Sequence, residues 1–343
     1  MNFLSKNKSI ILIIILFIGA LVVLFANNPK EFSVNIDDAL NTSSRIIIYG
    51  NNSKQIAKHC EEMVRTYDNM FSATDTTGEL YAFNHSDDEY AFSAETFDLI
   101  SDCEQFYYET NGAFDITLGV LSQLWNNAIL TATLPDENSI KDACALTDFS
   151  SLKFNEDNHS VSKTIKGQQI NLGAVAKGYI AENISQYLKS SEADGALVDL
   201  GGNIYVFGKR NNKDKWKIGI QNPFDLSNVI GTVDIDEGFV ITSGDYQRYM
   251  ISDNIRYHHI IDAKTGYPAK TNLRSVTIIS DNGFIGDALS TSCFLVGLEQ
   301  SIELINKYNV SGIIVTDDKR IFYSEGLSNV FNHIENEFTY ETF

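Results

Sequence analysis

Apolar residues recur along much of the chain at the spacing of an amphipathic helix. In the segment 53–72, Ile56, Cys60 and Val64 stand four residues apart, so a helix would gather them on one face. The segment 93–112 repeats the pattern, beginning with a serine suited to N-capping and ending with Asn-Gly. Further helices are predicted after Pro135, within 170–189, and around Asp287 with a break or cap near Gly297.

Short apolar runs bounded by turn residues predict strands. The predicted strands and hairpins are 45–50, 151–164, 195–200, 203–208 and 311–326, with several more between 215 and 280. Helices and neighbouring strand pairs alternate without a strict strand–helix–strand rhythm. We therefore predict an α+β fold with mixed or antiparallel sheets and flanking helices, rather than a doubly wound parallel sheet.

The first 30 residues differ from the rest of the chain. Ile10 to Ala26 is an unbroken apolar run, preceded by Lys6 and Lys8 and by no acidic residue. This pattern predicts a signal anchor within 1–30, with the N-terminus in the cytosol and a single domain, 31–343, outside the cytoplasm. A cleaved signal peptide and a buried core helix remain as alternatives.

Composition excludes some classes of function. The net charge of −19 argues against nucleic-acid binding, because such a surface repels phosphate backbones. For the same reason, a bound polyphosphate would need a local cation or backbone N–H groups. The four cysteines form no CxxC pair and are expected to be reduced and buried, although a disulfide stays possible. No GxSxG or HExxH motif occurs, which disfavours a serine hydrolase or a zinc peptidase.

The stretch "GDALSTS" contains a candidate metal site. Asp287 precedes Thr291 by four residues, so both would lie on one face of the predicted helix. A carboxylate and a hydroxyl are hard oxygen donors that suit Mg²⁺ or Ca²⁺. The alternative is that Asp287 is an acid near a helix N-terminus and Thr291 faces the core.

Two further stretches could bind an anion. In "INLGAVAKGYIAE", small residues precede a helix whose N-terminal N–H groups and Lys177 would attract negative charge. In "ITSGDYQRYM", the turn Ser243-Gly244-Asp245 could present N–H groups to phosphate oxygens, with Arg248 as a nearby cation. A tight helix–sheet contact and a surface turn are the respective structural alternatives.

The remaining two stretches are a turn and a pair of histidines. In "VDLGGNIYVFG", Asp199 and two glycines connect apolar strands, as a hairpin turn or as a surface for a flat ligand. In "YHHIIDAKTGYP", His258 and His259 would point to opposite faces of a strand. One of them could then face a site and accept a hydroxyl proton near neutral pH.

Taken in order, these stretches resemble the ApbE family of FAD:protein FMN transferases. "NGAFDITLGVLSQLW", "NLGAVAKGYIAE", "ALVDLGGNIYVFG", "TSGDYQRY", "HIIDAKTGYP" and "GDALSTSCFLVG" are similar to family signatures, and "LNTSSRIIIYG" is similar to the family's opening strand. The resemblance implies an α+β fold that holds FAD in a cleft with Mg²⁺ at its pyrophosphate. It also implies transfer of FMN to a threonine or serine hydroxyl of an acceptor protein, with release of AMP.

The resemblance also implies roles for individual residues. His259 corresponds to a proposed base and Asp287 to a catalytic metal ligand. The implied metal ligands are Ala174, Asp287, Ser290 and Thr291. The implied FAD contacts are Leu40, Ala113, Phe114, Asp115, Asn171, Lys177, Ser243, Gly244, Asp245 and Ile261.

The chain departs from the family pattern at several positions. Asn171 stands where an Asp is usual, Leu40 where Met is frequent, and Thr74 where many members have a Tyr that covers the flavin. Ala263 replaces a Pro. The Leu40 and Thr74 departures leave open a carrier that binds FAD without transferring it. A pyrophosphatase that releases FMN and AMP to water is a further alternative, because the same metal could activate water, and a mainly structural surface protein is the last.

Overall fold

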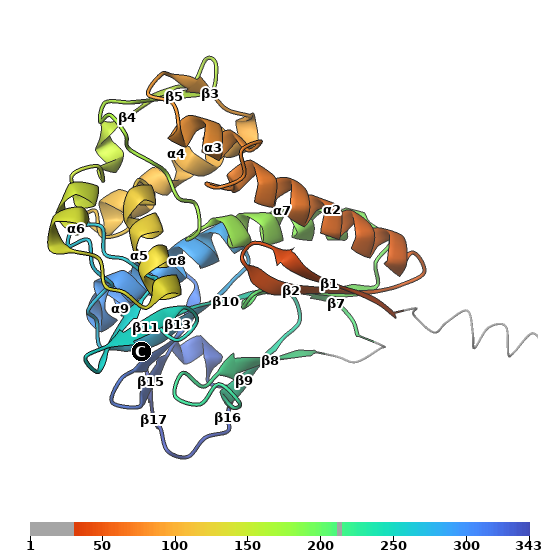
Figure 1. The fold of residues 1–343 in the computed structure, drawn as a ribbon. Helices are drawn as coiled ribbons and strands as arrows, with labels where there is room; N and C mark the ends of the chain where they lie inside the picture. The colour runs from red at the N-terminus through yellow and green to blue at the C-terminus, as the bar shows by residue number, and fades with distance from the viewer. Residues whose placement is uncertain (1–30, 211–214) are drawn as a thin grey trace, which may run out of the picture.

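The computed structural model describes residues 31–210 and 215–343, and a nine-stranded sheet forms the middle of this part of the chain (Figure 1). Neighbouring strands in it are antiparallel except for the last pair, which is parallel. In spatial order the strands are β1 (Glu31–Ala39), β2 (Thr42–Tyr49), β6 (Gly195–Leu200), β7 (Asn203–Gly208), β10 (Gly238–Gly244), β13 (Leu273–Ser280), β14 (Ser311–Thr316), β15 (Arg320–Tyr323) and β17 (Thr339–Thr342).

Both faces of this sheet carry buried side chains, because successive residues of a strand point to opposite sides and each side packs against another layer. On β10, Phe239 and Ile241 belong to a core shared with helices, whereas Val240 belongs to a second core on the other face. The second core is completed by a three-stranded sheet of β8 (Trp216–Gln221), β9 (Val229–Ile235) and β16 (Phe331–His333). The result is a helical layer, a large sheet and a small sheet (Figure 1).

The helical layer covers one face of the large sheet. Helices α2 and α7 lie side by side over it, and α8 packs against α7, β10 and β13 (Figure 1). The helices are α2 (Ser53–Phe71), α3 (Glu79–Asn84), α4 (Ala94–Glu109), α5 (Gly119–Thr131), α6 (Glu137–Cys144), α7 (Ala176–Ser190), α8 (Gly283–Val296) and α9 (Leu298–Lys307). Short 3₁₀ turns occur at Phe149–Ser151 and Glu325–Leu327.

Two small sheets lie at the periphery of the helical layer. One contains β3 (Tyr90–Ala91), β5 (Ser160–Lys163) and β4 (Leu152–Asn155). The other is the hairpin of β11 (Tyr249–Ser252) and β12 (Ile255–His258). A third cluster of buried apolar residues joins this hairpin to α5 and α6, with Trp125 stacked on Tyr257. The hairpin is therefore fixed against the body of the protein.

The α+β prediction is confirmed, and most predicted elements lie within a few residues of their expected bounds. The predicted N-cap Ser93 accepts a hydrogen bond from the Thr96 N–H, and the predicted break near Gly297 separates α8 from α9. The helices α3 and α5 were not predicted from the pattern, because α3 is only six residues long and α5 begins without a capping side chain.

The structure describes the cysteines but not the predicted signal anchor. All four cysteines are free thiols, and Cys60, Cys103 and Cys293 are buried as expected, whereas Cys144 is only half-buried. The proposed signal anchor, 1–30, lies outside the described residues. Within 31–210 and 215–343, no helix has the length and apolar character needed to span a bilayer.

Candidate active site

A cleft with a volume of about 270 Å³ opens beside the helical layer. Its walls come from the turn after β1, the segments before α5 and α7, the end of β10, the residues after β12, and helix α8. The predicted site residues that line it are Leu40, Phe114, Asp115, Asn171, Ala174, Lys177, Ser243, His259, Ile261, Asp287 and Thr291. Segments that are distant in sequence thus meet around one cavity.

Helices α7 and α8 cross at glycines, and this crossing fixes Asp287. A Cβ at Gly178 would collide with the backbone of Gly283 and with the Asp287 side chain, so only glycine permits the approach. The Gly178 N–H donates to Asp287 Oδ2 over 2.7 Å. Asp287 is only 3% exposed, and burial raises the pKa of its carboxyl, an effect that the Lys177 charge partly offsets. A carboxylate buried in this way gains from a cation in the cleft.

Hydroxyl groups surround the cleft side of α8. Ser243 Oγ lies 2.8 Å from Ser290 Oγ and 3.1 Å from Thr291 Oγ1. The Ser290 hydroxyl also donates to the Asp287 carbonyl, so it takes part in the helix itself. With Asp287 and the cleft-lining Ala174, these groups form a donor set made of oxygen atoms.

The donor set has only one carboxylate. Consistent with this, no cluster of three or more His, Cys, Asp or Glu side chains suited to a metal occurs in the described part of the chain. A protein-only cage for Ca²⁺ or Zn²⁺ is therefore a poor fit. Mg²⁺ fits better, because it usually keeps several waters and takes further oxygen ligands from substrate phosphates.

Two cations face the same cleft. Lys177 lies in the first turn of α7, and Arg248 lies in the loop between β10 and β11. Burial lowers the pKa of both side chains, and the Asp287 carboxylate partly counteracts this for Lys177. The N-cap residue of α7, Val175, has no side chain that could bond the first N–H groups of the helix. Together these features make an anion site.

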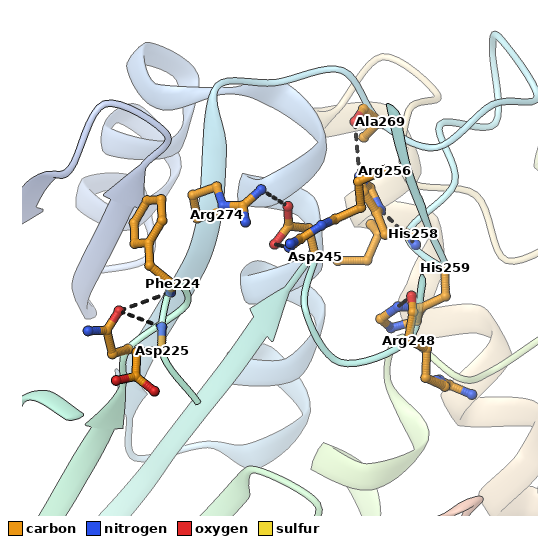
Figure 2. Close-up of polar contacts among 11 residues, drawn as sticks. Phe224, Asp225, Asp245, Arg248, Arg256, His258, His259, Ala269 and Arg274 are labelled. Atoms are coloured by element: carbon orange, nitrogen blue, oxygen red, sulfur yellow. Dashed lines mark hydrogen bonds and ion pairs between the residues drawn. The ribbon is translucent and has the colours of Figure 1, made fainter. Parts of the chain in front are cut away.

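The adjacent histidines face different surroundings, as predicted. His258 is buried, its Nε2 lying 3.1 Å from the Ala269 carbonyl oxygen and its Nδ1 accepting from the Ile260 N–H (Figure 2). His259 lines the cleft, and its Nδ1 lies 3.2 Å from the Arg248 carbonyl oxygen (Figure 2). Burial, followed by the charge of Arg248, lowers the pKa of His259 to about 3.

Some predicted FAD contacts have other partners in the structure. Asp245 does not line the cleft, and its carboxylate pairs with Arg256 over 3.0 Å and with Arg274 (Figure 2). Asp115 lines the cleft, but one of its oxygens accepts from Thr117 and the other from the Phe149 N–H. Ala113, Gly244 and Ser290 lie next to cleft-lining residues without lining it themselves.

Other polar residues on the cleft had no role assigned from the sequence. They are Asn41, Asp68, Ser72, Ser122, Gln123, Asn126, Thr242 and Gln247. Arg248, named from the sequence as a cation near the Ser-Gly-Asp turn, and Thr74, named as a departure from the family pattern, line the cleft as well. Asn126 and Gln123 carried no sequence signal, because α5 was not predicted and its exposed face has no distinguishing pattern.

Known proteins resemble this chain in both sequence and fold. Residues 40–314 match the model of the ApbE family. A Treponema pallidum protein named FAD:protein FMN transferase is 34% identical over 251 residues, which are 69% of each chain. A Klebsiella pneumoniae protein of the same name is 31% identical over 78% of this chain and 84% of its own.

Solved structures show the same fold. The ApbE protein of Thermotoga maritima superposes with a TM-score of 0.78 at 32% identity, covering 87% of this chain and 98% of its own. The flavin transferase ApbE of Vibrio cholerae gives a TM-score of 0.74 at 22% identity, covering 90% and 98%. At that lower identity the likeness concerns the fold alone.

Proposed function

Because the chain belongs to the ApbE family, we propose that it is a Mg²⁺-dependent FAD:protein FMN transferase that modifies a threonine or serine of an acceptor protein. One observation carries the proposal. A buried carboxylate, two cations and a neutral histidine converge on a single cleft. This combination suits a substrate with a charged pyrophosphate and a hydroxyl that must lose its proton.

The oxygen donors beside α8 would hold the metal ion. Asp287 and Thr291 would bind it through their side chains, with Ala174 contributing its carbonyl oxygen and Ser290 close by. When bound there, Mg²⁺ would polarise the phosphoryl oxygens of FAD and offset the negative charge that develops during transfer. Asp287 suits this role because its Oδ2 is already held by the Gly178 N–H.

The cations and the N-terminus of α7 would bind the pyrophosphate. Lys177 and Arg248 bring positive charge to the cleft of a protein whose net charge is −19. Such charges orient the phosphates and contribute to catalysis through positioning and charge stabilisation, which dominate phosphoryl transfer. The flavin and adenine would lie against the apolar wall formed by Leu40, Phe114 and Ile261.

His259 would act as the base. A carbonyl oxygen only accepts hydrogen bonds, so the contact with Arg248 requires the proton of the neutral ring to be on Nδ1. Nε2 then keeps its lone pair and can take the proton of the acceptor hydroxyl. The hydroxyl oxygen forms a bond to the phosphorus of the FMN half, the bond from that phosphorus to the bridging oxygen breaks, and AMP leaves with the bond's electron pair.

The N-terminal segment gives the proposed location. The apolar run within 1–30 would anchor the protein in the membrane by one span, with 31–343 outside the cytoplasm. Acceptors would then be extracytoplasmic electron-transfer proteins that carry covalent flavin. Protease protection in intact cells or spheroplasts tests this orientation separately from the activity.

Co-expression with secreted candidate acceptors tests the activity. We expect mass spectrometry to find FMN linked to a threonine or serine of the acceptor, and purified protein to release one AMP for each adduct only when Mg²⁺ is present. AMP and free FMN formed at the same rate without acceptor would instead indicate a pyrophosphatase. Stable FAD binding with no AMP released under any condition would indicate a carrier.

A further inference from the structure

The Gly-Gly turn between β6 and β7 ends in a buried asparagine. Gly201 and Gly202 have φ values of +66° and +94°, a region that favours glycine. Asp199 Oδ1 accepts from the Gly202 N–H over 2.8 Å and closes the turn. The next residue, Asn203, has no exposed surface. The turn therefore fixes the position of the buried Asn203 amide.

The amide of Asn203 contacts Lys177 and lies near Asp287. Its Oδ1 accepts from Lys177 Nζ over 3.1 Å. Its Nδ2 is buried and has no hydrogen-bond partner within the described residues, although Asn203 is near enough to the Asp287 carboxyl to favour the ionised form of that acid. Lys177 and Gly178 are consecutive in α7, so the ammonium that bonds Asn203 and the N–H that bonds Asp287 come from the same turn of this helix.

The donor and acceptor chemistry explains why an amide occupies this position. An ammonium group only donates hydrogen bonds and a carboxylate only accepts them. An amide is an uncharged group that offers an acceptor to the first and a donor to the second. Within the described residues, Lys177 bonds Asn203 and forms no ion pair with Asp287. Asn203 therefore bonds the Lys177 ammonium in place of a direct contact with Asp287, whose charge attracts that ammonium in the buried site.

We propose that Asn203 is a positioning residue that keeps the Lys177 ammonium away from Asp287, so that the carboxylate stays available to a divalent cation and the ammonium to a phosphate. This inference rests on the proposed function, because it assigns those ligands to the cleft. Without the amide, Lys177 would pair directly with Asp287 and compete with the cation. Asn203 touches neither substrate nor metal in this role.

Divalent-cation affinity tests the proposal without reliance on catalysis. The full-length chain is titrated with Mn²⁺ and free Mn²⁺ is followed by electron paramagnetic resonance, at FAD concentrations that saturate each variant. We expect Asn203→Ala to raise the Mn²⁺ dissociation constant by about 10- to 100-fold, as for loss of other groups that orient a metal ligand. In a Lys177→Met background, the same change should have little effect, because no ammonium is left to compete.

Comparing Asn203→Ala with and without Lys177 distinguishes a positioning role of Asn203 from a purely structural one. If Asn203→Ala raises the dissociation constant by the same factor with and without Lys177, Asn203 acts only structurally and the proposal is overturned. Asn203→Ser, which keeps a small polar side chain, is compared in both backgrounds so that a folding defect in the alanine variant does not decide the result. If the unaltered chain binds no Mn²⁺ with FAD present, the proposed metal-dependent function fails instead.

Asn222 supplies a matched control. It is equally buried, and its Oδ1 accepts from the Phe224 and Asp225 N–H groups in the turn after β8. Asn222→Ala removes a buried amide that does not line the cleft. We expect it to change the midpoint of unfolding while leaving the Mn²⁺ dissociation constant of the folded protein unaltered.

Discussion

Arg248 acts on His259 through both its backbone and its side chain. Its carbonyl oxygen holds the imidazole Nδ1 at 3.2 Å, and its guanidinium charge helps burial to lower the pKa of the ring (Figure 2). The first contact fixes the tautomer and the second disfavours protonation. Arg248 therefore orients the proposed base and, together with burial, keeps it neutral.

Replacing the proposed base should affect transfer far more than binding. We expect His259→Gln to lower the rate of FMN transfer by about 10²- to 10⁴-fold, the usual contribution of a general base. FAD affinity, measured by quenching of flavin fluorescence, should change little. His85→Gln, at an exposed position after α3, is the control. Equal rates for His259→Gln and the unaltered protein would exclude His259 as the base.

The lowered pKa of His259 predicts the pH dependence of FMN transfer. The pKa of His259 is lowered to about 3, so the ring stays neutral, and able to accept a proton, well below its ordinary titration range. The acid limb of kcat/KM, which reports the free protein, should therefore lie below pH 5 and not near 6.5. A limb near 6.5 that disappears in His259→Gln would show that the ring titrates normally.

The guanidinium of Arg248 should recognise the phosphates of FAD. Loss of a hydrogen bond between charged groups costs about 1.5–3 kcal/mol, so we expect Arg248→Met to weaken FAD binding by about 10- to 100-fold. Riboflavin has no phosphate, and its affinity should be unchanged. Arg65→Met removes an exposed arginine that pairs with Asp38 and Glu61, and it should affect neither ligand. An equal loss for both ligands would mean that Arg248 contacts the flavin ring.

Replacement of the Asp287 carboxylate should lower activity without lowering the stability of the fold. Asp287→Asn removes the carboxylate proposed to bind the metal, which we expect to lower kcat/KM by at least about 100-fold. Burial raises the pKa of this carboxyl, so its ionised form at pH 7 costs folding free energy that the amide avoids. The metal-free variant should therefore unfold at an equal or higher temperature in calorimetry.

Exposed Asp281, in the turn that precedes α8, gives the control for this change. Asp281→Asn should alter neither activity nor unfolding temperature. A loss of activity in Asp287→Asn accompanied by a large fall in unfolding temperature would contradict the argument, because it would trace the defect to folding.

The sequence was most informative where the relevant spacing is local. Asp287 and Thr291 line one cleft because four residues complete about one helical turn, and this needs no knowledge of the rest of the fold. Likewise, the adjacent His258 and His259 have different surroundings, although β12 ends at His258 and His259 follows it. The long helices and the antiparallel strands followed from periodicity for the same reason.

Sequence patterns did not predict contacts between side chains that are distant in sequence. Asp245 stands in a turn that resembles a phosphate site, but Arg256 and Arg274, from other strands, take its carboxylate. Asn203, the first residue of β7, lies near Lys177 and Asp287 only because α7 and α8 cross at glycines beside it. No local pattern shows which distant side chains will meet such a residue.

His258 should make the protein less stable as the pH falls. Burial lowers its pKa to about 4, whereas the ring in the unfolded chain titrates near 6.5. Between these values the unfolded state binds more protons, so the free energy of unfolding decreases as pH decreases through this window. From pH 7 to pH 5 we expect His258 to account for a loss of about 1–2 kcal/mol. Urea denaturation of the protein and of His258→Gln at both pH values measures the difference, and an identical loss in the two proteins would show that His258 is protonated equally in the folded and unfolded states.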